Sequence, residues 1–181
     1  MDRTGDAELV MAAREGDIDA FTALVDRYRT PALRLAYGIA GDDAEDAVQD
    51  AFVKTFRALA GFRTGAAFRP WLFTIVANEA RNRRRSMSRR TKLELRVSEQ
   101  PRLDGVAADN VAAEREQRRQ LVDAVAALPD RYREVVALRF FAALSESETA
   151  AVLSCPVGTA KSRLSRALDL LRVTLGEEVA L

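Results

Sequence analysis

Residues 144–171 read LSESETAAVLSCPVGTAKSRLSRALDLL, and this stretch decides the fold of the C-terminal part of the chain. Ser145 followed by Glu148 is a capping-box pattern, which predicts the start of a short helix. A turn at residues 154–156 follows, and a second helix begins at Val157. At about 100° per residue, small or apolar side chains share one face of that second helix. They are Ala160, Leu164, Ala167, Leu168 and Leu171.

The opposite face of the second helix is basic and carries hydroxyl groups. Its residues are Thr159, Ser162, Arg163 and Arg166, with Lys161 at its flank. Arginine can read guanine in the major groove, and serine or threonine can reach phosphates and bases. A short helix, a tight turn and a second helix with such a face together predict a helix-turn-helix that binds DNA. A solvated face on an ordinary helical hairpin is the alternative interpretation.

The rest of the chain also has helical periodicity, and β-branched runs bounded by turns are missing. We therefore expect an all-α protein. Pro31 is expected to bend or restart the helix that contains it. From about residue 86 to residue 111 the periodicity breaks down around Pro101 and Gly105, which is typical of a linker. The sequence predicts two small helical domains, 1–90 and 114–181, joined by a flexible linker at 91–113.

Composition excludes several classes of function. The 181 residues contain no histidine and one cysteine, Cys155, so an internal disulfide, the usual zinc site and Ser-His or Cys-His catalytic pairs are excluded. The chain also lacks a Gly-rich phosphate loop, and we expect neither an enzyme nor a cofactor or metal. No apolar run is long enough for a membrane span and the start does not resemble a signal peptide, so a cytoplasmic location is expected.

The net charge of +1 conceals two segregated charge clusters. The first is acidic: Asp42, Asp43, Glu45, Asp46 and Asp50. The second is basic: Arg81, Arg83, Arg84, Arg85, Arg89, Arg90 and Lys92. This separation suggests two different partners.

The acidic cluster lies on a helix that should run to about Ala60. Asp42 and Glu45 form a second capping-box pattern. Four residues are expected to face the core: Val48, Phe52, Phe56 and Leu59. Asp43, Asp46 and Asp50 lie roughly opposite, as an acidic face. The alternative is a solvated helix with favourable charges near its N-terminus.

Three segments together resemble sigma factors of the sigma-70 family, above all the extracytoplasmic-function group. They are DDAEDAVQDAFVKTF at 42–56, FRTGAAFRPWLFTIVANEARNRRR at 62–85 and CPVGTAKSRLSRA at 155–167. The resemblance implies a region 2-like helical bundle followed by a region 4-like helix-turn-helix. It also implies binding to core RNA polymerase and promoter DNA, both duplex and non-template single strand. An anti-sigma factor is expected because the family usually has one.

The resemblance assigns a partner to each segment. Residues of the first segment would bind the clamp of the largest polymerase subunit: Asp43, Asp46, Gln49 and Asp50. Residues 129–141 would bind the polymerase flap. Residues of the second segment would capture the −10 element, with aromatic or amide groups for extruded bases and arginines for phosphates. These residues are Phe62, Phe68, Trp71, Asn78, Arg81, Arg83, Arg84 and Arg85. The basic face of the third segment would contact the −35 element.

Other interpretations stay open on the sequence alone. Trp71 is more typical of a core residue than of a base platform, and the arginines could form a solubilising surface or a patch for anionic membranes. The whole chain could be a stand-alone helix-turn-helix regulator, or an interaction module that binds another protein. The acidic helix disfavours an independent DNA binder, because carboxylates repel phosphate.

Overall fold

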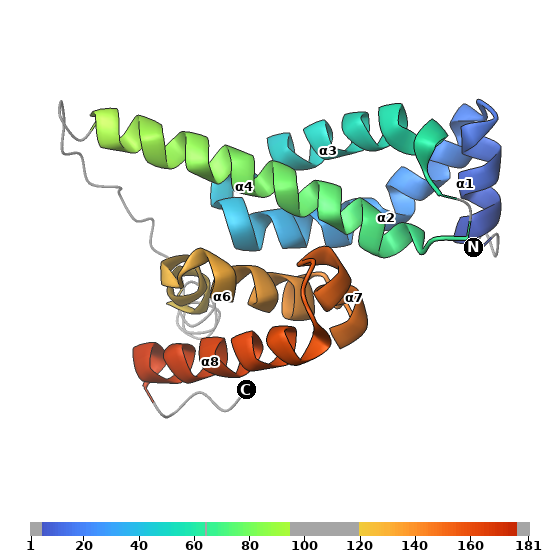
Figure 1. Ribbon diagram of the computed structural model, residues 1–181. Helices are drawn as coiled ribbons and strands as arrows, with labels where there is room; N and C mark the ends of the chain where they lie inside the picture. The colour runs from blue at the N-terminus through green and yellow to red at the C-terminus, as the bar shows by residue number, and fades with distance from the viewer. Residues whose placement is uncertain (1–4, 64, 95–119, 177–181) are drawn as a thin grey trace, which may run out of the picture.

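The computed structural model describes residues 5–63, 65–94 and 120–176, and the regular structure within these ranges is entirely helical. The all-α expectation is confirmed. The helices form two layers, with α1 to α4 in one and α6 to α8 in the other (Figure 1).

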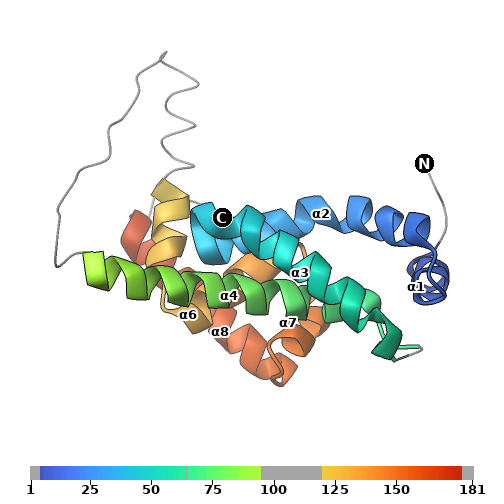
Figure 2. The same ribbon diagram turned by 90° about the horizontal axis from the view of Figure 1, so that it is seen from above.

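The first layer contains two long helices, and a third helix runs diagonally between them in the view of Figure 2. Its helices are α1 (Asp6–Arg14), α2 (Ile18–Ala40), α3 (Ala44–Ala58) and α4 (Phe68–Glu94). Asp17 caps α2, because its Oδ1 accepts hydrogen bonds from the backbone N–H groups of Asp19 and Ala20 at 2.9 and 3.0 Å. Helix α2 packs against α1, α3 and α4, so it organises this layer.

Two local expectations in the first layer concern Pro31 and Asp42, and the one at Asp42 is wrong. Helix α2 runs through Pro31 without restarting, since Ala32 and Leu35 on its inner face are fully buried and hold the next turn in place. The capping box at Asp42 is absent, because Asp42 lies in a short 3₁₀ turn, η1 (Gly41–Asp43), and α3 begins after it. A second 3₁₀ turn, η2 (Leu59–Gly61), ends the α3 segment.

The second layer begins with helical residues 120–127, which end at Leu128 and Pro129 as expected. It continues through α6 (Asp130–Val136), a π-helical turn η3 (Ala137–Phe141), α7 (Glu146–Val152) and α8 (Val157–Leu175). The Ser145 capping box is present. The backbone N–H of Glu148 donates to Ser145 Oγ at 3.2 Å, and the backbone N–H of Ser145 donates to Glu148 Oε2 at 2.8 Å.

A buried arginine fastens the start of the second layer. Arg133 of α6 is 3% exposed, and its guanidinium donates to the backbone carbonyls of Val125, Ala126 and Leu128. Val125 and Ala126 lie in the last turn of helix 120–127, where carbonyls run out of partners from their own helix, and Leu128 follows directly. The Val125 carbonyl also accepts the backbone N–H of Leu128 at 3.2 Å. Arg133 therefore holds the Leu128-Pro129 corner at a fixed angle.

The two layers share part of one hydrophobic core. Leu24 and Phe73 of the first layer belong to the same buried cluster as Leu138 and Leu144 of the second. A separate cluster inside the second layer joins Val125, Val135 and Leu171. Helix α4 continues past the expected boundary at residue 90 to Glu94, and the remainder of the expected linker, to residue 113, lies outside the described residues.

Candidate nucleic-acid and polymerase interfaces

Helices α7 and α8 form the helix-turn-helix that the sequence predicts. The turn between them places Ser154 at a φ of 50°, and the N–H of Cys155 donates to the carbonyl of Ala150 at 3.0 Å. On the inner face of α8, Ala160, Ala167 and Leu171 are buried. Ala167 and Leu171 pack in the same buried cluster as Val125 and Val135, so the rest of the second layer fixes the direction of the outer face of α8.

The outer face of α8 carries the side chains expected to read DNA. Lys161, Ser162 and Arg166 are exposed, whereas Thr159 and Arg163 are half-buried. Lys161 Nζ lies 3.0 Å from Glu146 Oε2 of α7, and Ser162 Oγ donates to the carbonyl of Thr159 at 3.0 Å. All five residues lie on one helix, but Lys161 is paired with a carboxylate.

One tyrosine touches this face from α6. Burial alone would raise the pKa of the Tyr132 hydroxyl, but a hydrogen bond with Arg166 and the nearby charge of Arg131 lower its pKa. Arg131 also lies over the Tyr132 ring, 4.6 Å from the centroid. Sequence reasoning missed Tyr132 as a neighbour of the DNA-reading helix.

The acidic face of α3 contacts the arginines of α4. Asp46 and Asp50 have side chains 62% and 45% exposed, and both accept hydrogen bonds from Arg83, at 3.1 and 2.5 Å. Hydrogen bonding to Asp50 is the main reason that the pKa of Arg83 is raised. Gln49 is exposed beside them and Asp43 is half-buried. The acidic residues of α3, assigned by the resemblance to polymerase, and Arg83 of α4, assigned by it to DNA, are therefore neighbours.

Two other arginines of α4 reach across to the second layer. Arg81 Nε lies 2.6 Å from Glu134 Oε1, and Arg84 Nε lies 3.6 Å from Asp130 Oδ1. Arg81 also donates to Asn78 Oδ1 at 2.5 Å. Arg85 is exposed.

The aromatic side chains expected to capture a base form a packed cluster. Phe62 and Phe68 are 6% and 5% exposed, and Trp71 is half-buried against both, with ring centroids 4.7 and 5.7 Å away. The core interpretation of Trp71 agrees with this packing. Phe56, which we expected in the core, is instead 50% exposed and meets only the edge of the core through Phe21, so that expectation is wrong.

A cavity of about 450 Å³ lies beside the aromatic cluster, between α1 and the loop before α4. Phe62 and Phe68 line its floor, together with the loop residues Gly65, Ala66 and Ala67. A nucleobase is small enough to enter such a cavity. Asn78 is exposed on the next turns of α4.

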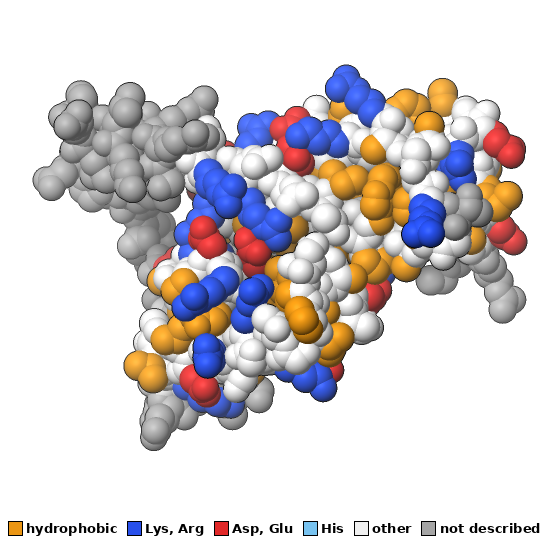
Figure 3. Space-filling view, in the orientation of Figure 1, with side chains coloured by type: hydrophobic (Ala, Val, Ile, Leu, Met, Phe, Trp, Pro, Cys, Tyr) orange, Lys and Arg blue, Asp and Glu red, His pale blue; other side chains and the backbone are white. Residues whose placement is uncertain are grey.

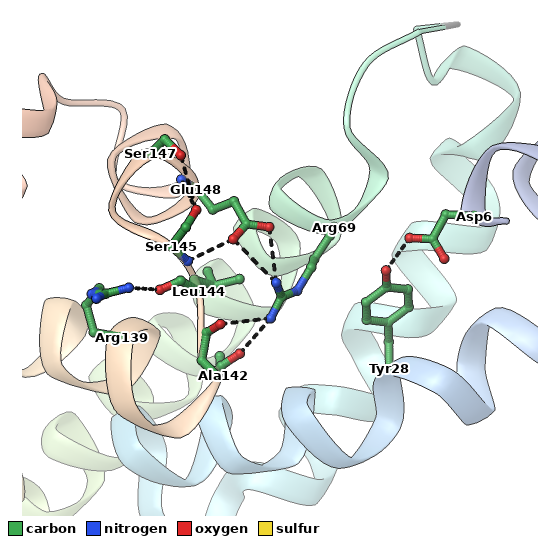
Figure 4. A network of polar contacts seen from close by, with 10 residues as sticks. Asp6, Tyr28, Arg69, Arg139, Ala142, Leu144, Ser145, Ser147 and Glu148 are labelled. Atoms are coloured by element: carbon green, nitrogen blue, oxygen red, sulfur yellow. Dashed lines mark hydrogen bonds and ion pairs between the residues drawn. The ribbon is translucent and has the colours of Figure 1, made fainter.

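Sequence reasoning missed Arg69, which joins the two layers near this cavity (Figure 4). Its Nη1 lies 3.2 Å from Glu148 Oε1, and its Nη2 donates to the carbonyls of Ala142 and Ala143 at 3.0 Å. Glu148 thus caps α7 and binds Arg69 at once. No local pattern marks a contact between residues so far apart in the chain.

Comparison with known proteins agrees with this geometry. The family model of sigma-70 region 2 matches residues 24–90, and that of sigma-70 region 4 matches residues 118–171. RNA polymerase sigma-H factor of Pseudomonas aeruginosa is 34% identical over 92% of this chain and 91% of its own length. The ECF RNA polymerase sigma-E factor of Escherichia coli is 33% identical over 92% of each chain.

Two solved structures share the fold. CnrH, in complex with the cytosolic domain of CnrY, has a TM-score of 0.74 and 28% identity, with 96% of this chain and 99% of that chain covered. The sigma factor RpoE of Bartonella quintana, in complex with the anti-sigma factor NepR, has a TM-score of 0.67 and 27% identity, with 90% of this chain and 100% of that chain covered.

A helical chain with a helix-turn-helix and an acidic helix beside a basic one is typical of proteins that act in transcription. Within that class, the chain belongs to the extracytoplasmic-function sigma factors of the sigma-70 family, and it is an RNA polymerase sigma factor. In the described ranges, no helix is long and apolar enough to cross a membrane, and no cluster of side chains could hold a metal ion.

Proposed function

We propose that this sigma factor binds core polymerase through α3 and residues 129–141, reads the −35 element with α8, and opens the −10 element with α4 and the preceding loop. The observation that carries the proposal is the outer face of α8. Its basic and hydroxyl side chains stand opposite a buried apolar face, on the second helix of a helix-turn-helix. The proposed units are residues 1–90 for the −10 element, 91–113 as a linker, and 114–181 for the −35 element.

For the −35 element, Arg163 and Arg166 are the side chains we assign to base edges. Arginine can donate two parallel hydrogen bonds to guanine, a geometry that lysine cannot reproduce. Thr159, Lys161 and Ser162 lie closer to the N-terminus of α8, where hydroxyl and amino groups suit the phosphate backbone. The Tyr132 hydroxyl forms a hydrogen bond with the Arg166 side chain.

For the −10 element, we assign phosphate contacts to Arg81, Arg83, Arg84 and Arg85, and base capture to the cavity beside Phe62 and Phe68. Those two rings are too buried to stack with a base as they stand, so we propose that they form the apolar floor of the cavity. The Trp71 ring packs against both rings. Asn78, exposed on α4, is assigned a hydrogen bond to the captured strand.

For polymerase, we assign the clamp contact to Asp43, Asp46, Gln49 and Asp50, and the flap contact to residues 129–141. The acidic side chains are exposed enough to meet a basic surface while they stay bound to Arg83. In this scheme the chain catalyses no chemical reaction of its own. It acts in the cytoplasm, where polymerase and DNA lie.

We also propose an anti-sigma factor as a partner. CnrH was solved with the cytosolic domain of CnrY bound, and the Bartonella quintana RpoE was solved with NepR bound. NepR is named as an anti-sigma factor. This chain matches nearly the full length of each, so the same surfaces are available to a comparable partner.

Permanganate reactivity of thymines in promoter DNA tests the opening step. Core polymerase with this chain is expected to expose thymines around the −10 element, whereas core polymerase alone or the chain alone is not. A stand-alone helix-turn-helix regulator would bind the duplex without polymerase and leave its thymines protected. Protection in the complete mixture, together with equal duplex binding by the chain alone, would overturn the proposal.

A further inference from the structure

The cavity proposed to capture a base has a second wall, which no motif in the sequence marks. Figure 3 shows hydrophobic and basic side chains side by side over the end of the first layer where α1 lies. Ala7, Met11 and Arg14 of α1 line the cavity, together with the floor residues Phe62 and Phe68. The three α1 residues are spaced four and three positions apart, so they share one face of the helix. One face of α1 is therefore turned toward the cavity.

Asp6, the first residue of α1, fastens this helix to α2. Its carboxylate accepts a hydrogen bond from Arg27 Nη1 at 2.5 Å and another from the Tyr28 hydroxyl, which points toward it in Figure 4. Tyr28 is 7% exposed. Burial and the hydrogen bond to Asp6 raise the pKa of the Tyr28 hydroxyl, so this group is protonated at neutral pH and keeps its proton for Asp6.

Tyr28 also touches the floor of the cavity. The centroid of its ring lies 5.7 Å from that of Phe68 and 6.2 Å from that of Phe73. One tyrosine thus contacts the floor with its ring and holds the first turn of α1 with its hydroxyl. Helix α1 has nine residues, too few for a stable helix by itself, so its position depends on contacts of this kind.

The polar groups at the cavity suit one unpaired nucleotide. The two carboxylates that line it already have partners, since Asp6 is bound to α2 and Glu148 to Arg69. Arg14 lies exposed in the last turn of α1, where a guanidinium can bind the phosphate of the captured nucleotide. Met11 is 55% exposed, and its thioether can contact the face of an aromatic ring. The cavity therefore offers an apolar surface for a base and a cation for its phosphate.

We propose that α1 is the wall that holds the captured base against the cavity floor, and that Asp6 is a positioning residue that sets this wall through Tyr28. This inference rests on the proposed function. An unpaired base of the non-template strand enters between α1 and Phe68, and Met11 contacts its face. Asp6 acts on the base through α1, because its contacts with α2 fix the distance between wall and floor.

Two substitutions test the wall and its anchor separately. Ala7→Leu adds a larger side chain to the cavity side of α1, at an exposed site where leucine is compatible with the helix. Ala58→Leu, at an exposed site of α3 outside the cavity, is its matched control. Tyr28→Phe removes the hydroxyl that binds Asp6 and keeps the ring. Tyr37→Phe, at an exposed tyrosine of the same helix, is the control for that change.

The measurement uses core polymerase, the full chain and a fluorescein-labelled promoter fragment whose non-template strand is unpaired across the −10 element. In a series of fragments, one nucleotide at a time in that strand is replaced by an abasic site. For wild type we expect a position at which loss of the base weakens binding on the order of tenfold, as for one stacked base. Ala7→Leu should weaken binding of the intact strand by a similar factor and remove the penalty at that position and at no other.

Tyr28→Phe should reduce the penalty at the same position by about threefold, as for one lost hydrogen bond, and both controls should match wild type. The remaining positions are an internal control, because a variant that only disturbs the fold weakens binding of every fragment alike. If Ala7→Leu keeps helical circular dichroism but leaves the profile at wild-type values, or weakens all fragments equally, α1 is not the wall.

An unchanged profile for Tyr28→Phe would overturn the positioning role of Asp6, whatever the result for Ala7→Leu. Failure of the proposed function has a different signature, which is seen in wild type alone. A wild-type complex that binds every abasic fragment as tightly as the intact strand would refute base capture itself, before any variant is compared.

Discussion

The Arg83 guanidinium of α4 donates a hydrogen bond from Nη2 to Asp50 Oδ2 of α3 at 2.5 Å. This contact joins the basic stretch assigned to DNA to the acidic face assigned to polymerase. Since Asp46 lies 3.1 Å from the same guanidinium, one arginine borders both surfaces. The surfaces proposed for polymerase and for promoter strands are therefore adjoining faces of two packed helices.

Replacing Asp46 and Asp50 by lysine should weaken binding to core polymerase by about tenfold, roughly 1.4 kcal/mol, because a basic partner surface then meets like charge. The free energy of unfolding should fall by less than about 1 kcal/mol, since both carboxylates are solvent-exposed. Fluorescence titration with core polymerase and urea unfolding measure the two quantities. Asp26→Lys, on an exposed site of α2, is the control, and unchanged affinity of the double variant would refute the clamp assignment.

Arg163→Ala and Arg166→Ala should each weaken binding to the preferred −35 sequence by about 1–3 kcal/mol and relax selectivity there, if the side chain reads a base edge. Selection from a randomised −35 library by the polymerase complex measures both effects. Equal losses on every sequence would place these arginines on phosphates, which contradicts base reading. Arg172→Ala, on the last turn of α8, should leave selectivity unchanged.

Glu148 should make the stability of the chain depend on acid pH. Burial raises the pKa of its carboxyl, but hydrogen bonds from Ser145 and the charge of Arg69 outweigh burial and leave the pKa below its ordinary value of 4.5. A lowered pKa stabilises the folded state above the unfolded-state pKa, and this stabilisation is lost as pH falls through the folded-state value. Glu148→Gln should therefore be about 1 kcal/mol less stable than wild type at pH 7.

Urea unfolding of both proteins at a series of pH values checks this dependence. The difference between wild type and Glu148→Gln should narrow as pH falls below about 4.5, the region in which the wild-type carboxylate takes up its proton. A difference that stays constant from neutral pH to about pH 3 would show that the charge of Glu148 contributes nothing.

Arg133→Met should lower the free energy of unfolding by about 3 kcal/mol, because the carbonyls of Ala126 and Leu128 would lose the guanidinium donor and that of Val125 would keep only the backbone N–H of Leu128. Arg131→Met is the matched control. Arg131 is exposed and lies over the Tyr132 ring, so its loss should cost less than about 1 kcal/mol. Chemical unfolding monitored by circular dichroism measures the free energy of unfolding of both variants. Equal losses of stability would contradict the role given to Arg133.

The helix-turn-helix was predictable because its signals are local. Ser145 and Glu148 are three residues apart and form the expected capping box, and the small face of α8 follows helical spacing. Helix α2 continues through Pro31 because its buried inner face outweighs one lost backbone hydrogen bond. The capping box at Asp42 fails for a different reason. The chain turns at Gly41, whose φ is 62°, so Asp42 lies in a 3₁₀ turn before α3 begins.

Contacts between the layers were not predictable from one sequence. Arg69 and Glu148 are 79 residues apart, and neither belongs to a motif that requires the other. Gly38 of α2 makes room for the Phe141 ring of η3, and no local pattern marks that contact. The candidate DNA-binding groups could thus be named from the sequence, whereas the contacts that join the two layers depend on tertiary packing.

Transcription in vitro tests the central claim most directly. Purified chain and core polymerase are mixed with a promoter library, and the transcripts are sequenced. We predict transcripts that start at a defined distance from a shared pair of −35 and −10 sequences, and that vanish when the chain is omitted. Transcripts with no shared promoter sequence, or the same transcripts from core polymerase alone, would contradict the assignment of this chain as a promoter-reading sigma factor.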